Sequence, residues 1–243
     1  MRPFMRVLEL SAMGAAAALL SACTEPAPPA SEQSAANESA AVQIKAPAGR
    51  YQVDPDHSFL HFSVKHLGLA DYIARFTRQQ ITLDFDPANL AASSVVATID
   101  PASVRTDYSG DYRAGHPEAK FQSWDEELAQ SAQFFNAAAY PKIEFRSTRV
   151  EQTGADTLRV VGNLSLLGRT HPVTLEAKLT GSSETHPFEG AGGALGFSAT
   201  GSFKRSDFGM TYLLEPPLIG DAVTIEFDGE LKQAKEQAAT PAD

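Results

Sequence analysis

The feature that most constrains this chain is an alternation of apolar and polar residues with a period of two. In one clear example, Leu60, Phe62 and Val64 are separated by polar residues. A half-buried β-strand shows this period, and an amphipathic helix does not. The same alternation recurs along most of the chain, which predicts an all-β protein. The alternating stretches are 60–65, 81–86, 95–99, 143–150, 158–167, 173–180, 195–204 and 223–231.

Most of these eight stretches are separated by short connections. Residues 167–170 (Leu-Gly-Arg-Thr) lie between two clean strands and predict a tight hairpin. The exception is a long insertion, 101–140, with weak helical character around 124–135. Consecutive antiparallel strands with one apolar face favour an up-and-down barrel or a sandwich.

The interior of such a barrel decides what the protein can do. Eight strands enclose a space that side chains just fill, or that holds one small ligand. Several residues on the expected inward face are small, which predicts an elongated apolar cavity. The alternative is that the glycines mark bends or bulges. The small residues are Ala97, Gly162, Ala177, Ala199, Gly201 and Gly229.

The N-terminal segment, 1–22, has the character of a targeting signal. Arg2 and Arg6 precede an apolar stretch at 10–20 that is too short to span a bilayer. The segment ends in Leu20-Ser21-Ala22-Cys23, which resembles the lipobox of bacterial lipoproteins. That resemblance implies cleavage before Cys23 and lipidation of Cys23. Because Thr24 follows, it also implies an outer-membrane lipoprotein that faces the periplasm. The alternative is an ordinary secretory signal with an incidental cysteine.

Composition separates the remaining segments and excludes some functions. Residues 23–49 are rich in Ala, Pro and Ser and predict a disordered linker, followed by a folded domain at 50–231 and a disordered tail at 232–243. A formal net charge of −10 argues against nucleic-acid binding. A single cysteine excludes an intrachain disulfide and any metal site with two thiolate ligands.

Residues with catalytic or metal-binding chemistry are present but not suitably arranged. The chain lacks a Gly-x-Ser-x-Gly motif. On one strand, His57 and His61 would share a face and His66 would lie on the other, so the three do not converge on a metal. Glu126 and Glu127 are expected on a solvated helix face. We therefore predict a protein that is not an enzyme, with no catalytic residues, metal or cofactor.

Five motifs along the chain resemble those of YceI-like, polyisoprenoid-binding proteins. The resemblance implies an eight-stranded antiparallel, lipocalin-like barrel with a short helical insertion. It also implies an isoprenoid ligand, such as a quinone or its precursor, and self-association into homodimers in the bacterial envelope. The motifs are Tyr51-x-Val53-Asp54-x-x-His57-Ser58-x-Leu60-x-Phe62-x-Val64-Lys65-His66-x-Gly68, Ser103-Val104-Arg105-Thr106, Tyr140-Pro141-x-Ile143-x-Phe145-x-Ser147, Gly162-Asn163-Leu164-Ser165-Leu166-x-Gly168 and Phe203-x-Arg205-Ser206-Asp207-Phe208-Gly209.

The expected function is to bind a polyisoprenoid or other long-chain amphiphilic lipid, for carriage or storage at the envelope. Apolar burial alone favours such binding, without catalytic groups. His57 and Arg205 are candidates for contact with a polar headgroup, and a structural ion pair or turn is the alternative role for Arg205. The alternative functions are an interaction module with a filled barrel, or a metal-dependent enzyme. The expected ligand-binding residues are Phe62, Val64, Phe76, Leu83, Phe85, Phe145, Leu164, Leu175, Phe197 and Phe203.

Overall fold

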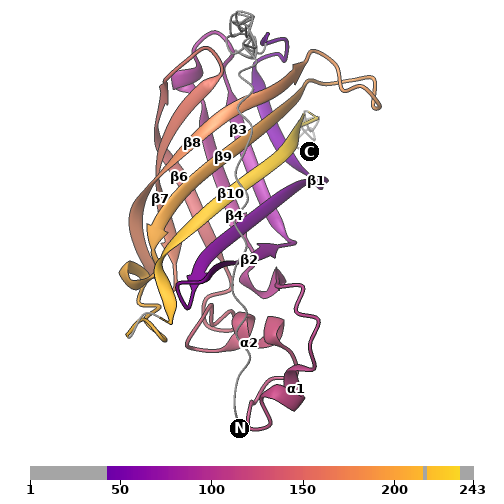
Figure 1. The fold of residues 1–243 in the computed structure, drawn as a ribbon. Helices are drawn as coiled ribbons and strands as arrows, with labels where there is room; N and C mark the ends of the chain where they lie inside the picture. Colours follow the sequence, from indigo (N-terminus) through magenta and orange to yellow (C-terminus); the bar gives the residue numbers. More distant parts are fainter. Residues whose placement is uncertain (1–42, 216–217, 236–243) are drawn as a thin grey trace, which may run out of the picture. The chain divides into compact units, whose positions relative to one another are not determined.

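The computed structural model describes residues 43–215 and 218–235, and these form a β-barrel with two short α-helices (Figure 1). The helices are α1 (Tyr112–Gly115) and α2 (Trp124–Gln130), and three single-turn 3-10 helices are η1 (Leu90–Ala92), η2 (Pro101–Ser103) and η3 (Arg205–Phe208). The strands are β1 (Gly49–His66), β2 (Ala70–Phe76), β3 (Gln79–Phe85), β4 (Ser94–Ile99), β5 (Val104–Arg105), β6 (Ile143–Gln152), β7 (Thr157–Leu166), β8 (Arg169–Ser183), β9 (Ala194–Lys204) and β10 (Ile219–Gln233).

The strands are antiparallel and follow one another around the barrel in chain order. The ring runs β1, β3, β4, β6, β7, β8, β9, β10, and β10 pairs back with β1. The first residues of β1 pair with β3 and its last residues pair with β2, so β2 and β3 together extend along one side of β1. The prediction of an eight-stranded up-and-down barrel is confirmed. The sandwich alternative is wrong, because the pairing of β1 with β10 closes the sheet.

The tight turn between β7 and β8 is the predicted hairpin. Both of its central residues, Leu167 (φ 52°) and Gly168 (φ 73°), have positive φ angles. The β1–β2 hairpin repeats this arrangement with Leu67 (φ 53°) and Gly68 (φ 68°). Positive φ at both central positions is typical of a type I′ turn, whose twist matches that of the flanking strands.

One end of the barrel is closed by residues that precede β1. The Tyr51 side chain is fully buried, and its hydroxyl donates to the carbonyl oxygen of Pro47 at 2.7 Å. Ala46 is 3% exposed, and its backbone N–H donates to Ser182 Oγ at 2.9 Å.

The ordered unit therefore extends slightly beyond both predicted boundaries. The sequence places residues 43–49 in a disordered linker, but in the structure they contact the barrel. Residues 232–233 belong to β10, and the Ala234 N–H donates to the Arg50 carbonyl oxygen at 2.7 Å. The rest of the predicted linker and tail, and the predicted signal with Cys23, lie outside the described residues.

The insertion between β5 and β6 lies at the other end of the barrel, where Figure 1 shows α1 and α2. Helix α2 begins at a cap in which the Ser123 side chain accepts from the Glu126 N–H. Its Trp124 indole donates to the Tyr72 hydroxyl on β2 at 2.7 Å. The predicted helix at 124–135 is shorter than expected, because α2 ends at Gln130 and a turn follows. Within 43–215 and 218–235, no helix is long and apolar enough to cross a membrane.

Candidate functional site

The barrel encloses a cavity of about 680 Å³. Its wall consists of inward-facing side chains from all eight strands of the ring, joined by residues of the insertion and of the connection before β10. The volume lies within the range of small-molecule sites, about 300–1,000 Å³. All ten residues that the sequence suggests for ligand binding line this cavity. That they contact a ligand stays a prediction.

Small side chains contribute to the open volume only in part. The three glycines of the predicted set do not leave space, because neighbouring side chains cover them. Phe145 lies where a Cβ on Gly162 would point, and Leu175 covers Gly201 in the same way. Their contribution to the cavity was wrongly predicted, since cross-strand neighbours fill the gap. The three alanines of the set do line the cavity: Ala97, Ala177 and Ala199.

The cavity opens at the end of the barrel that carries the insertion. Four of its lining residues are also substantially exposed, with relative accessibilities of 48% for Leu67 and Tyr108, 37% for Tyr212 and 36% for Leu218. These residues belong to the β1–β2 hairpin, the insertion and the connection before β10. We call this opening the mouth.

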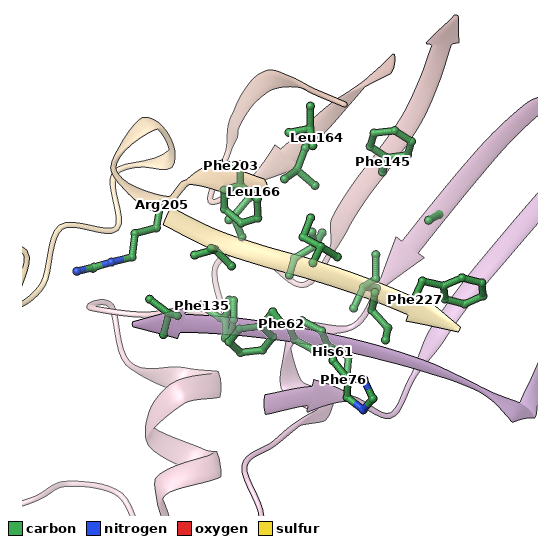
Figure 2. Close-up of a pocket in the computed structure, with 18 of the residues that line it drawn as sticks. His61, Phe62, Phe76, Phe135, Phe145, Leu164, Leu166, Phe203, Arg205 and Phe227 are labelled. Carbon is green, nitrogen blue, oxygen red and sulfur yellow. The ribbon is translucent and has the colours of Figure 1, made fainter. Parts of the chain in front are cut away.

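Aromatic side chains from separate elements pack together inside the barrel, near the mouth. Phe62 of β1 lies 5.3 Å from Phe76 of β2, between ring centroids. Phe135 of the insertion lies 5.7 Å from Phe62 and 5.3 Å from Phe76, with edge-on geometry. Figure 2 shows these three side chains grouped around β1. The insertion therefore supplies part of the cavity wall.

Glu127 of α2 lines the cavity, although the sequence suggests a solvated position. Its carboxylate accepts a hydrogen bond from the Tyr112 hydroxyl. Burial raises the pKa of Glu127 above its ordinary value. Tyr112 is 4% exposed and stacks on His116, with 4.6 Å between ring centroids, and on Trp124, at 6.2 Å. The expectation for Glu127 is wrong because contact between α1 and α2 covers this face of the helix.

Arg205 lines the cavity, but its guanidinium is hydrogen-bonded to the backbone. Its guanidinium donates four hydrogen bonds of 2.8–3.0 Å to the carbonyl oxygens of Met210, Tyr212, Ile219 and Gly220. Burial lowers the pKa of Arg205. In Figure 2 its side chain extends away from the labelled aromatic residues. Arg205 therefore acts as a clamp that holds together the two ends of the connection before β10. The four N–H groups that it uses for this are not free to bind a headgroup.

His57 is not among the cavity-lining residues, so it is placed away from any ligand inside the barrel. It lies in β1 between Val53 and Ser58, where the pairing with β10 shifts register. Its side chain is 63% exposed, and its Nδ1 lies 2.8 Å from Asp54 Oδ2. That hydrogen bond raises the pKa of His57.

Asp54 is the centre of this polar group. Its side chain is 4% exposed, and Lys232 Nζ lies 2.9 Å from its Oδ2. Burial alone would raise the pKa of Asp54, but hydrogen bonds from His57, Lys232 and the Asp56 N–H outweigh it and lower the pKa to about 2. Atoms of Asp54, His57 and Glu230 that could ligate a metal lie within 4.8 Å of one another. The Lys232 ammonium already supplies a cation to this carboxylate.

Residues of the mouth are those that sequence reasoning missed. The segment that contains Tyr112, His116 and Trp124 has no hydrophobic periodicity, so the alternation that identifies the strands gives no information about it. One usable signal is present, namely a concentration of aromatic residues in a segment with only short helices. Such a segment cannot bury its aromatic rings by itself, so it must pack on something else.

Comparisons with known proteins agree with this architecture. A sequence profile described as YceI-like domain matches residues 51–231. Protein YceI of Salmonella arizonae is 38% identical over 171 residues, covering 70% of this chain and 80% of that protein. Protein YceI of Salmonella heidelberg matches equally.

Solved structures with the same fold come from several bacteria. A Campylobacter jejuni YceI protein has a TM-score of 0.57 and 26% identity, over 70% of this chain and 90% of that one. Burkholderia cenocepacia BcnA has a TM-score of 0.58 and 22% identity, over 75% and 99%. A polyisoprenoid binding domain from Saccharophagus degradans, implicated in plant cell wall breakdown, has a TM-score of 0.51 and 16% identity, over 77% and 99%. The last two show the fold alone.

Proposed function

This chain belongs to the YceI-like family, and we propose that its barrel binds the apolar chain of a polyisoprenoid or similar long-chain amphiphilic lipid, such as a quinone or an isoprenoid precursor. The observation that carries the proposal is the cavity of about 680 Å³, whose wall inside the barrel is built from aliphatic and aromatic side chains. Burial of an apolar chain against such a wall contributes about 25 cal/mol per Å². The Saccharophagus degradans domain, which is described as polyisoprenoid binding, supports the same ligand class.

The role we propose is carriage or storage, with no chemical step. Most of the described residues that line the cavity are apolar, and the side chains of Glu127, His116 and Arg205 hydrogen-bond to Tyr112 or to backbone carbonyl oxygens. No cofactor beyond the bound lipid is part of this proposal.

We also propose that the protein is a lipoprotein of the outer membrane that faces the periplasm. The support is the sequence Leu20-Ser21-Ala22-Cys23, with Thr24 next in the chain. Lipidation of Cys23 with two or more acyl chains would give stable anchoring, since a single chain binds a membrane only marginally. Self-association into homodimers is proposed from the family resemblance.

Native mass spectrometry of the mature chain from Thr24 onward, exported to the periplasm of a host, tests the lipid-binding proposal. We expect a stoichiometric adduct, which organic extraction identifies as a long-chain lipid. Ala199→Phe places a ring in the cavity and should reduce adduct occupancy several-fold. Thr200→Phe, the same change one residue along on the exposed face of β9, should leave occupancy unchanged.

A clean apo mass that stays unchanged after incubation with a long-chain quinone and a prenol would overturn the proposal. That result would favour an interaction module with no lipid ligand. The same spectra report whether the protein is a monomer or a dimer. Lipidation is tested separately, by the mass of the N-terminal peptide from the full chain.

A further inference from the structure

The mouth of the cavity is rich in hydrogen-bonding groups and poor in available positive charge. Among the described residues that line the cavity, Glu127 is the only carboxylic acid and Arg205 is the only lysine or arginine. Phosphate recognition is strongest where free N–H donors of an arginine or lysine face the phosphate oxygens. Because Arg205 directs four N–H groups at backbone carbonyls, its guanidinium is occupied.

Two arginines near the mouth also have polar partners. Arg113, in α1, donates to the carbonyl oxygens of Ala119, Phe121 and Pro117. Arg105 donates to the Val104 carbonyl oxygen at 2.6 Å, and its Nε lies 3.9 Å from the Asp125 carboxylate. Neither arginine lines the cavity. A phosphorylated headgroup would therefore lose its water at the mouth without gaining a free cationic partner from the cavity lining.

Glu127 adds a negative charge at the same place and is held there. Its carboxylate accepts from the Tyr112 hydroxyl, and the Tyr112 ring is fixed by stacking on His116 and Trp124. The Glu127 side chain is partly buried, so a second negative charge nearby would be screened less than it would be in open solvent. An uncharged hydroxyl or carbonyl headgroup meets hydrogen-bonding partners here and no repulsion.

From this distribution of charge we infer that Glu127 makes the mouth selective for lipids with uncharged headgroups over the same lipids in phosphorylated form. The inference rests on the proposed function, which it deepens by assigning a headgroup class. Glu127 is thus a specificity-determining residue of the cavity.

Trp124 provides a local signal for the test, because it is the single tryptophan of the chain and lines the mouth. Its fluorescence can be used to titrate delipidated protein with geranylgeraniol and with geranylgeranyl diphosphate, which share one apolar chain. The titrations are run at pH 8, where an unperturbed histidine is neutral. We expect the wild type to bind the alcohol at least tenfold more tightly than the diphosphate.

The variant Glu127→Gln keeps an acceptor for Tyr112 and removes the charge. It should reduce the ratio of the two affinities about tenfold, the order expected for one charge at close range in a partly buried site. The matched control is Glu126→Gln, the same change at the adjacent exposed carboxylate, which does not line the cavity. This control should leave the ratio unchanged.

Equal affinities in the wild type, or tighter binding of the diphosphate, would overturn the inference while lipid binding stands. The wild-type ratio needs no variant, so it remains informative even if Glu127→Gln fails to fold. Equal shifts in Glu127→Gln and Glu126→Gln would also overturn it, since they would reflect net charge and not the mouth. Binding of neither lipid would overturn the proposed function itself.

Discussion

Arg205 carries a permanent charge at a position that is only 3% exposed. Among the described residues, no carboxylate lies within ion-pair distance of its guanidinium, and backbone carbonyls take that place. The four carbonyl acceptors belong to both ends of the connection before β10, so one side chain determines the path of this part of the mouth. Removal of this buried guanidinium is costly, because the carbonyl oxygens that accept its hydrogen bonds are then left without a donor.

Replacement of Arg205 by Met should therefore lower the free energy of unfolding by about 3 kcal/mol or more, since several buried carbonyls lose their donor. The measurement is urea denaturation followed by circular dichroism. Arg50→Met is the control, because Arg50 pairs with Asp84 where both side chains are more than half exposed. Such a surface pair contributes less than about 1 kcal/mol. Equal losses in the two variants would contradict the clamp.

The Asp54 group predicts how stability depends on pH. The pKa of Asp54 is about 2 in the folded protein and 3.8 in its ordinary state. A group with a lowered pKa stabilises the fold above its unfolded pKa, and this contribution is lost as the pH falls through the folded pKa. Denaturation at pH 5 and at pH 2 should thus differ by about 2 kcal/mol from this residue.

Asp54→Asn should remove this share of the acid sensitivity, whereas Asp228→Asn, at an exposed position on β10, should not. The raised pKa of His57 has the opposite sign. Its contribution is fully present below pH 6.5 and is lost as the pH rises through the folded pKa. A pH profile that is identical in the wild type and Asp54→Asn would contradict the assignment.

At the scale of elements, the β1–β2 and β7–β8 hairpins both have a type I′ turn with glycine as the second central residue. A Cβ on Gly68 would meet no atom within 4 Å, whereas a Cβ on Gly168 would lie 2.9 Å from Tyr140 Cε1. The two turns therefore share a backbone conformation, but the space around the second central residue is open at Gly68 and filled by Tyr140 at Gly168. Backbone strain acts at both, and a steric clash acts at Gly168 alone.

Gly68→Ala should cost about 1 kcal/mol, the strain of a left-handed conformation for a residue with a Cβ. Gly168→Ala should cost more, because Tyr140 must also move. Gly115→Ala is the control, since Gly115 has neither a positive φ nor an atom within 4 Å of its Cβ position, and this change should be neutral or stabilising. Thermal denaturation measures all three. Equal costs at Gly68 and Gly168 would show that Tyr140 yields freely.

At the scale of the whole molecule, the first and last strands of the ring pair with each other along most of their length. Every strand of the ring therefore contributes to the cavity wall, and the insertion narrows one end of the cavity while residues 44–47 and Tyr51 close the other. A ligand inside this enclosure contacts strands that are distant in the sequence. Its binding should stabilise the barrel as a unit.

Removal of bound lipid should accordingly lower the melting temperature, and its return should restore it. A ligand present at 100 times its Kd stabilises the folded state by about 2.7 kcal/mol. For a domain of this size that corresponds to about 5–10 °C. Differential scanning calorimetry of extracted and reloaded protein makes the measurement, and Ala199→Phe should show a smaller difference. An unchanged melting temperature on reloading would contradict binding inside the barrel.

The period-two alternation determined which residues face inward along the strands, because neighbouring side chains of a strand point to opposite faces whatever the strand pairs with. Phe62, Leu83 and Phe145 could therefore be assigned to the interior from local sequence. Only the tertiary structure decided what those positions do. Whether a small residue leaves space depends on its cross-strand neighbour, as Phe145 over Gly162 shows. The mouth depends on contacts such as that of Trp124, in a segment without periodicity, with Tyr72 on β2. Such contacts lie far apart in the chain, so no local pattern encodes them.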